Sequence, residues 1–389
     1  MKFINQFGKN GITSIVLQER GFIQLEKEDV SQADLIFASV DKLKDIYTAI
    51  PQKFTKQTFK ISHFRNHGQI TRKDMLAYHL RNAAKTSKKL GLGLDFSFLP
   101  TTFFLPMEFT SIPQNIKLIV KPACLARGAK IFIPDSYQDL NSWYNQVYSK
   151  LQIKKQQLDM NNDDSSEFIY IVQNYISPPL TLFNHKFDCR IYVLVKSFNP
   201  LNVWICDLAF ARVASADYDD NSRISGLTNI SVNKSNNPQE LKIQLNKVNQ
   251  ILDLESPGKF RKGIKDSEMS IIRCLQVVSD KVIQEQACFE LLGFDVLFDS
   301  DYKNYIMEAN ASPSLSIDGN DDRLLKKRML HDMFSIVYDE DATIRYGCWR
   351  QIYYGSVGKN MKTWDQGIIE SNQSLADDIC RASKFIRGD

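Results

Sequence analysis

The feature that most constrains this chain is an apolar alternation that carries two acidic side chains, GFDVLFDSDYKNYIMEAN at residues 293–310. Two such runs around a polar turn predict an antiparallel hairpin. If the turn lies between Asp301 and Tyr302, Asp295 faces Glu308 across the two strands, and such partners are about 5 Å apart. The same register pairs Phe298 with Tyr305 and Val296 with Met307.

The predicted hairpin gathers oxygen ligands on one face. Asn310 is two residues beyond Glu308, so it lies on the same side of the strand. Two carboxylates this close need a cation or a shared proton between them. Hard oxygen ligands suit Mg²⁺, which binds one or two carboxylates together with substrate phosphates. We therefore predict that Asp295, Glu308 and Asn310 hold a metal ion; the alternative is an exposed polar face with ordinary charges.

Composition narrows the class of protein. The 389 residues exceed what one small core needs. The net charge of +4 argues against a polybasic tail as the main means of binding an anionic partner. It is compatible with a local basic groove. No apolar run reaches the roughly 20 residues of a membrane span, and the start lacks a signal-peptide core. Seven cysteines without a CxxC pair argue against a disulfide framework or a zinc ribbon. These observations predict an intracellular protein.

Hydrophobic periodicity predicts an α+β chain with mostly antiparallel strands. The expected helices span 12–20, 72–90, 268–292 and 321–338. The expected strands span 33–40, 118–122, 131–134, 168–176, 187–198 and 202–214, besides the hairpin. Polar stretches at 159–167, 215–226, 233–240 and 255–266 predict loops.

Cations stand at the ends of several expected strands. Lys121 ends LIVKP, and the loop Arg127-Gly128-Ala129-Lys130 that follows lets backbone N–H groups approach phosphate, although it is not a Walker loop. Lys186, Asp188 and Arg190 alternate, so they share a face. Arg212 interrupts an apolar strand and needs an anionic partner, which is either a substrate or a structural carboxylate.

Several ordered stretches together resemble the tubulin–tyrosine-ligase-like enzymes, which are ATP-grasp amino-acid ligases. The most specific are KFDCRIYVLV (186–195) and FELLGFDVLFDSDYKNYIMEANASPSL (289–315). The resemblance covers about residues 60–335, and the tract 321–335 is most similar to the polyglutamylase catalytic-subunit branch. It implies an ATP-grasp-type multi-lobe fold with nucleotide bound between lobes. The implied divisions are an N-terminal α/β domain (1–72), a central ATP-grasp domain (73–176), a C-terminal ATP-grasp domain with the metal site (177–338) and a C-terminal extension (339–389).

The resemblance also implies roles for individual residues. Nucleotide contacts are implied for Lys121, Arg127, Gly128, Gln173, Asn174, Tyr175, Ile176, Lys186, Phe187, Asp188, Thr228 and Asn229. Substrate contacts are implied for Arg212, Ser231 and Lys234. Catalytic roles are implied for Arg190, Arg212 and Glu308. The implied Mg²⁺ ligands are Asp295, Glu308 and Asn310, in agreement with the hairpin register.

The implied reaction is ATP-dependent addition of free glutamate to glutamate side chains of acidic tubulin tails through an acyl phosphate. The expected location is the cytoplasm and cytoskeleton, at a cilium, axoneme or basal body, with accessory subunits as further partners and with neither nucleic acid nor membrane. An electropositive groove for the tail is expected among Lys53, Lys56, Lys60, Arg65, Arg72 and Lys73, unless these form an ordinary solvated face.

The sequence departs from active relatives at two places. Those usually carry G-K-G or G-R-G where this chain has Gly128-Ala129-Lys130, and a histidine where it has Gly226. The alternative is therefore a catalytically weak or inactive member that serves as a structural protein of microtubules or axonemes. Glycine as the ligated amino acid is a further alternative, against which Lys234 argues because a cation suits the γ-carboxylate that glycine lacks.

Overall fold

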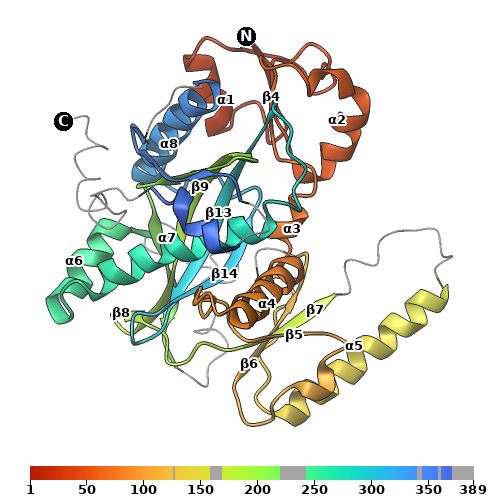
Figure 1. Ribbon diagram of the computed structural model, residues 1–389, viewed down its shortest axis with the longest axis vertical. Coiled ribbons are helices and arrows are strands. Elements are labelled where there is room, and N and C mark those ends of the chain that lie inside the picture. The colour runs from red at the N-terminus through yellow and green to blue at the C-terminus, as the bar shows by residue number, and fades with distance from the viewer. Residues whose placement is uncertain (126–127, 158–168, 220–241, 340–343, 358–360, 370–389) are drawn as a thin grey trace.

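The computed structural model describes all residues except 126–127, 158–168, 220–241, 340–343, 358–360 and 370–389 (Figure 1). Its centre is a large mixed sheet in the order β15-β16-β10-β9-β13-β4-β3-β1-β2. The N-terminal part is parallel: β1 (Lys2–Asn5), β2 (Ile23–Gln24), β3 (Leu35–Phe37) and β4 (Lys60–Ser62) run with β13 (Cys288–Phe298).

The rest of this sheet is antiparallel and is built around β9 (His185–Phe198). The remaining strands are β8 (Thr181–Leu182), β10 (Leu201–Cys206), β11 (Phe210–Asp217), β12 (Lys242–Gln244), β14 (Asn304–Asn310), β15 (Arg345–Tyr346) and β16 (Trp349–Gly355). Side chains of β9 alternate between two hydrophobic clusters, Val193 in one and Leu194 in the other. The sheet is therefore buried on both faces at this strand, which is why its sequence is almost continuously apolar.

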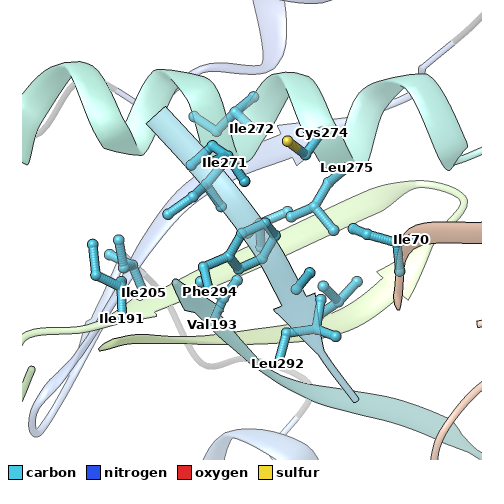
Figure 2. Packing of buried hydrophobic residues seen from close by; sticks show 14 of the residues in the cluster. Ile70, Ile191, Val193, Ile205, Ile271, Ile272, Cys274, Leu275, Leu292 and Phe294 are labelled. Atoms are coloured by element: carbon cyan, nitrogen blue, oxygen red, sulfur yellow. The ribbon is translucent and has the colours of Figure 1, made fainter. Parts of the chain in front are cut away.

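Helices cover both faces of the large sheet. On one face α7 (Lys259–Val278) presents Ile271 and Leu275 to Val193 and Phe294 (Figure 2). On the other face α1 (Ile12–Glu19) and α8 (Asn320–Tyr338) lie side by side (Figure 1). Besides α5 (Tyr137–Gln157), which packs on a smaller sheet, the other helices of the described residues are α2 (Leu43–Ala49), α3 (Gly68–Thr71), α4 (Lys73–Leu90) and α6 (Leu245–Glu255). Short 3-10 turns occur at Val40–Lys42, Pro51–Lys53, Phe109–Ser111 and Met361–Gly367.

A second, smaller sheet stands apart from the first at the lower right of Figure 1. It contains β5 (Thr102–Phe104), β7 (Tyr170–Asn174) and β6 (Leu118–Pro122), with β7 in the middle. The long helix α5 (Tyr137–Gln157) packs on it through Leu140 and Trp143, which form a separate hydrophobic cluster with Val120 and Val172. The α+β class and the mostly antiparallel strands predicted from sequence are thus confirmed.

Several predicted elements were wrong in extent. The helix expected at 268–292 ends at Val278, and its start at Lys259 lies inside the expected loop 255–266. Gly263 does not break this helix but allows close packing, because a Cβ there would lie 2.7 Å from the Tyr302 carbonyl oxygen. The single strand expected at 202–214 is two strands, β10 and β11, with different partners. The strand expected at 131–134 is reduced to one β-bridge between Phe132 and Val120.

Nothing in the structure tests the division into four domains, which stays a prediction. Within the expected extension 339–389, however, β16 pairs with β10 and buries Trp349 and Tyr353 completely. This strand is part of the central sheet rather than a peripheral addition. None of the described helices is both long enough and apolar enough to cross a lipid bilayer.

Candidate functional site

The hairpin of β13 and β14 pairs the two predicted acids. Asp295 faces Glu308 and Gly293 faces Asn310, as the sequence register predicted. The next pair is Val296 with Ile306, because the register shifts there. The predicted pairs of Val296 with Met307 and of Phe298 with Tyr305 were therefore wrong. A bulge of this kind re-aims side chains near a site, and here both Met307 and Glu308 line the same cavity.

Asp295 is held by two guanidinium groups. Arg190 Nε lies 2.6 Å from Asp295 Oδ1, and Arg212 Nη2 lies 2.7 Å from Oδ2. Arg212 also binds Asp188 in a two-point fork at 2.6 and 2.7 Å. Burial opposes ionisation of Asp295, but the two arginines outweigh it and hold the pKa of this carboxyl well below its usual range. The result is a buried array of alternating charges.

Glu308 has a different partner, contributed by the start of α4. Lys73 Nζ lies 2.9 Å from Glu308 Oε2 and donates to the Leu125 carbonyl oxygen at 2.8 Å. Asn310 Nδ2 donates to Glu308 Oε1 at 3.1 Å and to Asp295 Oδ2 at 3.4 Å. The three predicted metal ligands thus lie within contact of one another.

The donor chemistry of this trio fits Mg²⁺. Two carboxylates with an amide oxygen leave several coordination positions for water and phosphate oxygens, as Mg²⁺ requires. In the structure the amide nitrogen of Asn310 faces the carboxylates, and rotation of the amide would turn its oxygen to a cation. Among the described residues no group of three or more His, Cys, Asp and Glu side chains could hold a metal ion, so a dense structural metal site is absent there.

Cations from the smaller sheet and from β9 face these acids. Lys121 on β6 donates to Gln173 Oε1 at 2.9 Å, and Gln173 Nε2 donates to Thr102 Oγ1 at 3.0 Å. Burial of Lys121 lowers the pKa of its ammonium group to about 8, although Glu308 and Asp295 oppose this shift. Lys186 donates to the Tyr175 hydroxyl at 2.9 Å and lies over its ring.

The acids Asp295 and Glu308 and the cations Lys73, Lys121, Lys186 and Arg212 line one cavity of about 110 Å³ between the two sheets. The predicted residues that contact these groups without lining the cavity are Arg190, Gln173, Tyr175 and Asn310. That volume is below what a whole nucleotide needs and matches only its phosphate end. The residues lining it are Lys73, Ile119, Lys121, Pro122, Leu125, Gly128, Ala129, Ile131, Lys186, Asp188, Arg212, Asp295, Leu297, Met307 and Glu308. Sequence segments from both sheets therefore converge on one charged cavity.

Some predicted residues lie elsewhere. The ring of Phe187 points into the core and packs against Phe260, with the ring centroids 6.1 Å apart. Asn174 is the last residue of β7 and Ile176 lies two residues beyond it, and neither lines the cavity. Predicted contacts at Arg127, Thr228, Asn229, Ser231 and Lys234, and the departure at Gly226, lie outside the described residues.

Sequence reasoning missed the role of Lys73, which it assigned to a basic groove. Two other cations of that predicted groove also have acidic partners: Arg65 binds Glu285, and Arg72 binds Asp74 at 2.8 Å. A groove made of unpaired cations is therefore not formed at these three positions. No local signal marks Lys73, because its partner Glu308 is far away in the chain and only the fold brings the two together.

The chain is similar to known proteins over most of its length. The Tubulin-tyrosine ligase family matches residues 53–344. A Caenorhabditis elegans protein named "Probable tubulin polyglutamylase ttll-9" is 32% identical, over 86% of this chain and 80% of its own length. A Bos taurus protein named "Probable tubulin polyglutamylase TTLL9" is 29% identical, over 84% and 77%. A Tetrahymena thermophila protein named "Probable alpha-tubulin polyglutamylase Ttll1" is 28% identical, over 88% and 86%.

Proposed function

The chain belongs to the tubulin–tyrosine ligase family, and from this membership and the site geometry we propose that it is an ATP-dependent ligase that adds glutamate to glutamate side chains of tubulin tails. One observation carries the proposal. Lys121 of the small sheet, Lys186 and Arg212 of the large sheet, and Lys73 of α4 line one cavity together with the paired carboxylates Asp295 and Glu308. Phosphate groups and a divalent cation are the ligands that satisfy both halves of such an arrangement.

The nucleotide would lie with its phosphates in this cavity. Lys121 and Lys186 supply positive charge to them, and the backbone around Gly128, which adopts a positive φ of 72°, can turn N–H groups toward them. Tyr175 and the backbone of β7 would contact the base, and Asp188 a ribose hydroxyl. Asp295, Glu308 and Asn310 would hold Mg²⁺, which neutralises charge on the transferring phosphoryl group when bound.

The reaction needs positioning and charge rather than a nucleophilic side chain. An oxygen of the acceptor carboxylate bonds to the γ-phosphorus, and the bond from that phosphorus to ADP breaks. The amine of free glutamate then bonds to the acyl carbon, phosphate leaves, and the amine loses a proton as the amide forms. Arg190 and Arg212, which both bind Asp295, would stabilise the developing negative charge through their guanidinium groups.

Arg212 has a second proposed task, which is to hold a carboxylate of the incoming glutamate. In the structure its guanidinium is engaged by Asp188 and Asp295. Binding of Mg²⁺ to Asp295 would weaken that pair and leave one edge of Arg212 for the substrate. Ser231 and Lys234 are proposed to complete this subsite. We place the protein on the cytoskeleton, at cilia or basal bodies, with accessory subunits as partners.

A catalytically weak structural member of the family is the second candidate. The observation that favours it is the loop at Gly128-Ala129-Lys130. Lys130 adopts a φ of 56°, in the left-handed region that favours glycine, and active relatives have glycine there. A strained loop would contact phosphate less well.

Incubation of the purified chain with tubulin, Mg·ATP and radiolabelled glutamate or glycine separates these functions. The proposal predicts incorporation of glutamate and not of glycine, which stops when Glu308→Gln is introduced. Mg·ATP binding without incorporation, with tubulin and the proposed partner subunits present, would favour the structural candidate. Glycine incorporation would overturn the assigned substrate.

A further inference from the structure

A row of buried polar side chains crosses the small sheet and ends at the charged cavity. Thr102 on β5 lies directly opposite Gln173 on β7, and Lys121 on β6 is a diagonal neighbour of Gln173. The exposed fractions of Thr102, Gln173 and Lys121 are 5%, 2% and 5%. The other face of this sheet packs on α5 through apolar side chains. The row therefore lies on the face turned away from α5, and its last member, Lys121, lines the cavity.

The neighbours of this row on the same face are apolar. Phe104 and Ile171, each two residues along a strand from a member of the row, pack against Ala77 of α4. Burying polar side chains beside such residues costs free energy unless each one finds a hydrogen-bond partner. Even a fully satisfied polar network adds little stability beyond that of apolar side chains of the same size. Stability alone therefore does not require the row to be polar.

The hydrogen bonds of the row run in one direction, which a backbone carbonyl group sets. The Pro100 carbonyl oxygen can only accept, and Thr102 Oγ1 donates its single hydrogen to it at 2.7 Å. Thr102 Oγ1 is then an acceptor for Gln173 Nε2, which lies 3.0 Å away. The other end of the amide, Gln173 Oε1, accepts from Lys121 Nζ at 2.9 Å. The hydroxyl group of Thr102 thus decides which end of the Gln173 amide faces the ammonium group.

The start of the row is tied to helix α4. Arg81 of α4 binds the two carboxylate oxygens of Glu108 at 2.9 Å each, and the Phe104 N–H donates to Glu108 Oε2 at 3.0 Å. Arg81 also donates to the Thr102 carbonyl oxygen at 3.4 Å. The same helix begins at Lys73, which lines the cavity. One helix therefore holds both the strand that carries Thr102 and one wall of the cavity.

Lys121 is oriented by this row without being neutralised by it. Lys73 binds the Glu308 carboxylate at 2.9 Å, whereas no carboxylate of the described residues lies within ion-pair distance of the Lys121 ammonium group. A neutral amide oxygen fixes the direction of an ammonium group but leaves its charge and its other hydrogens for an anion. Gln173 and Thr102 do not line the cavity. They can therefore act on an anion bound there through Lys121.

We propose that Thr102 and Gln173 are positioning residues, which hold the Lys121 ammonium group in the direction that the nucleotide phosphates require. This inference rests on the proposed ligase function. It goes further, because it gives Thr102, a residue that lies outside the cavity, a part in nucleotide binding. A lysine that is ordered before the ligand arrives loses less side-chain freedom on binding, and that saving appears as affinity.

The first test needs no nucleotide. The full chain, labelled with ¹⁵N at lysine and held at pH 6, should show the NMR signal of a slowly exchanging ammonium group that is absent from Lys121→Met. Thr102→Val keeps the shape of the side chain and removes the hydroxyl group, and it should shift or abolish this signal. Thr102→Ser restores the hydroxyl group and should restore the signal. Thr101→Val is the matched control at the exposed neighbouring position and should leave the signal unchanged.

The second test is a double-mutant cycle on the affinity for a non-hydrolysable ATP analogue with Mg²⁺. Thr102→Val should weaken binding roughly two- to tenfold, the range expected when one lysine side chain must be ordered on binding. In the Lys121→Met background the same change should have no effect, because the group that it positions is gone. Gln173→Met serves as a second variant should Thr102→Val fold poorly, since Thr102 keeps its bond to Pro100 in it.

Three results would overturn the proposal: a wild-type chain without the Lys121 signal, a signal that Thr102→Val leaves unchanged, or an equal loss of affinity in the presence and absence of Lys121. The last result would assign the row a purely structural role. A wild-type chain that binds no nucleotide would instead refute the proposed ligase function, and the NMR comparison would still decide whether Thr102 holds Lys121.

Discussion

Buried charged residues have different kinds of partner on the two sheets. On the large sheet Asp295 is enclosed by Arg190 and Arg212, each at hydrogen-bond distance, and its pKa falls because those cations outweigh burial. On the small sheet Lys121 donates to the neutral amide of Gln173, and its pKa falls to about 8 because burial dominates. The large sheet therefore carries charges that stabilise one another, and the small sheet carries a cation that an anionic ligand would stabilise.

The largest loss of stability is expected on substitution of Asp295. Asp295→Ala leaves two buried guanidinium groups short of a partner, and we expect it to lower the free energy of unfolding by about 3–5 kcal/mol. Glu308→Ala should lower it by only about 1 kcal/mol, because Glu308 is more exposed and Lys73 keeps its bond to Leu125. Both variants should lose glutamate incorporation. Urea unfolding of the pair measures the contrast, and equal losses of stability would show that the two acids are not held differently.

Arg212→Ala is expected to cost about 3 kcal/mol of stability, because Asp188 loses its two-point partner while Asp295 keeps Arg190. Glutamate incorporation should be abolished, and ATP affinity should stay within a few-fold because Lys121 and Lys186 remain. Arg212→Lys keeps the charge and loses the fork, so it should recover stability in part but not activity. An Arg212→Ala chain that incorporates glutamate at the wild-type rate would remove Arg212 from the mechanism.

A smaller loss of stability is expected from a substitution at Gly293, where the Arg190 side chain lies close to β13. A Cβ on Gly293 would lie 2.8 Å from Pro313 Cβ and 3.0 Å from Arg190 Cδ. Gly293→Ala should therefore displace Arg190 or the loop after Asn310, with a loss of about 1–3 kcal/mol. Thermal unfolding and Mg²⁺-dependent nucleotide binding measure it. Gly11→Ala is the matched control, since a Cβ there meets nothing nearer than 3.7 Å; a similar loss in both variants would contradict the packing argument.

The pH dependence of nucleotide binding tests whether the charged form of Lys121, on the small sheet, binds the phosphates. Because the pKa of Lys121 is about 8, the side chain is charged below pH 8 and neutral above it. Nucleotide affinity should fall with rising pH by up to about tenfold per unit above 8, with proton uptake on binding. Stability shows the opposite sign, since the unfolded lysine binds more protons between pH 8 and 10.5 and the folded state gains as pH rises. Calorimetry in two buffers of different ionisation heat measures the uptake, and Lys121→Met should remove it.

The smallest change in ATP affinity is expected from substitutions in the loop Gly128-Ala129-Lys130. Ala129→Lys combined with Lys130→Gly places glycine where φ is 56° and should leave ATP affinity unchanged or raise it. Titration with a non-hydrolysable ATP analogue measures it. A large loss of affinity would show that Lys130 itself binds the phosphates.

Sequence predicted the parts of the site that are local. Asp295, Glu308 and Asn310 lie on one hairpin, whose alternation sets which side chains share a face. The bulge after Asp295 was not predictable, because two registers with the same apolar pattern differ only in how the turn is closed. Lys73 and the carboxylate partners of Arg212 depend on contacts between distant segments, which no spacing in the chain reveals.

The same contrast between local patterns and contacts of distant segments applies to the fold. Strand β9 and helix α8 were found because their apolar periodicity is strong. The first half of α7 was missed because it is charged and contains Gly263, whose reason is the close approach of Tyr302 in the folded protein.

The most direct test of the proposed ligase chemistry follows one oxygen atom. An acidic acceptor peptide whose side-chain carboxylates carry ¹⁸O is incubated with the purified chain, Mg·ATP and glutamate, and the released phosphate is examined by mass spectrometry. The account predicts one ¹⁸O in each phosphate released per glutamate added, because a carboxylate oxygen bonds to the γ-phosphorus and leaves with it. Glutamate addition with unlabelled phosphate would contradict it.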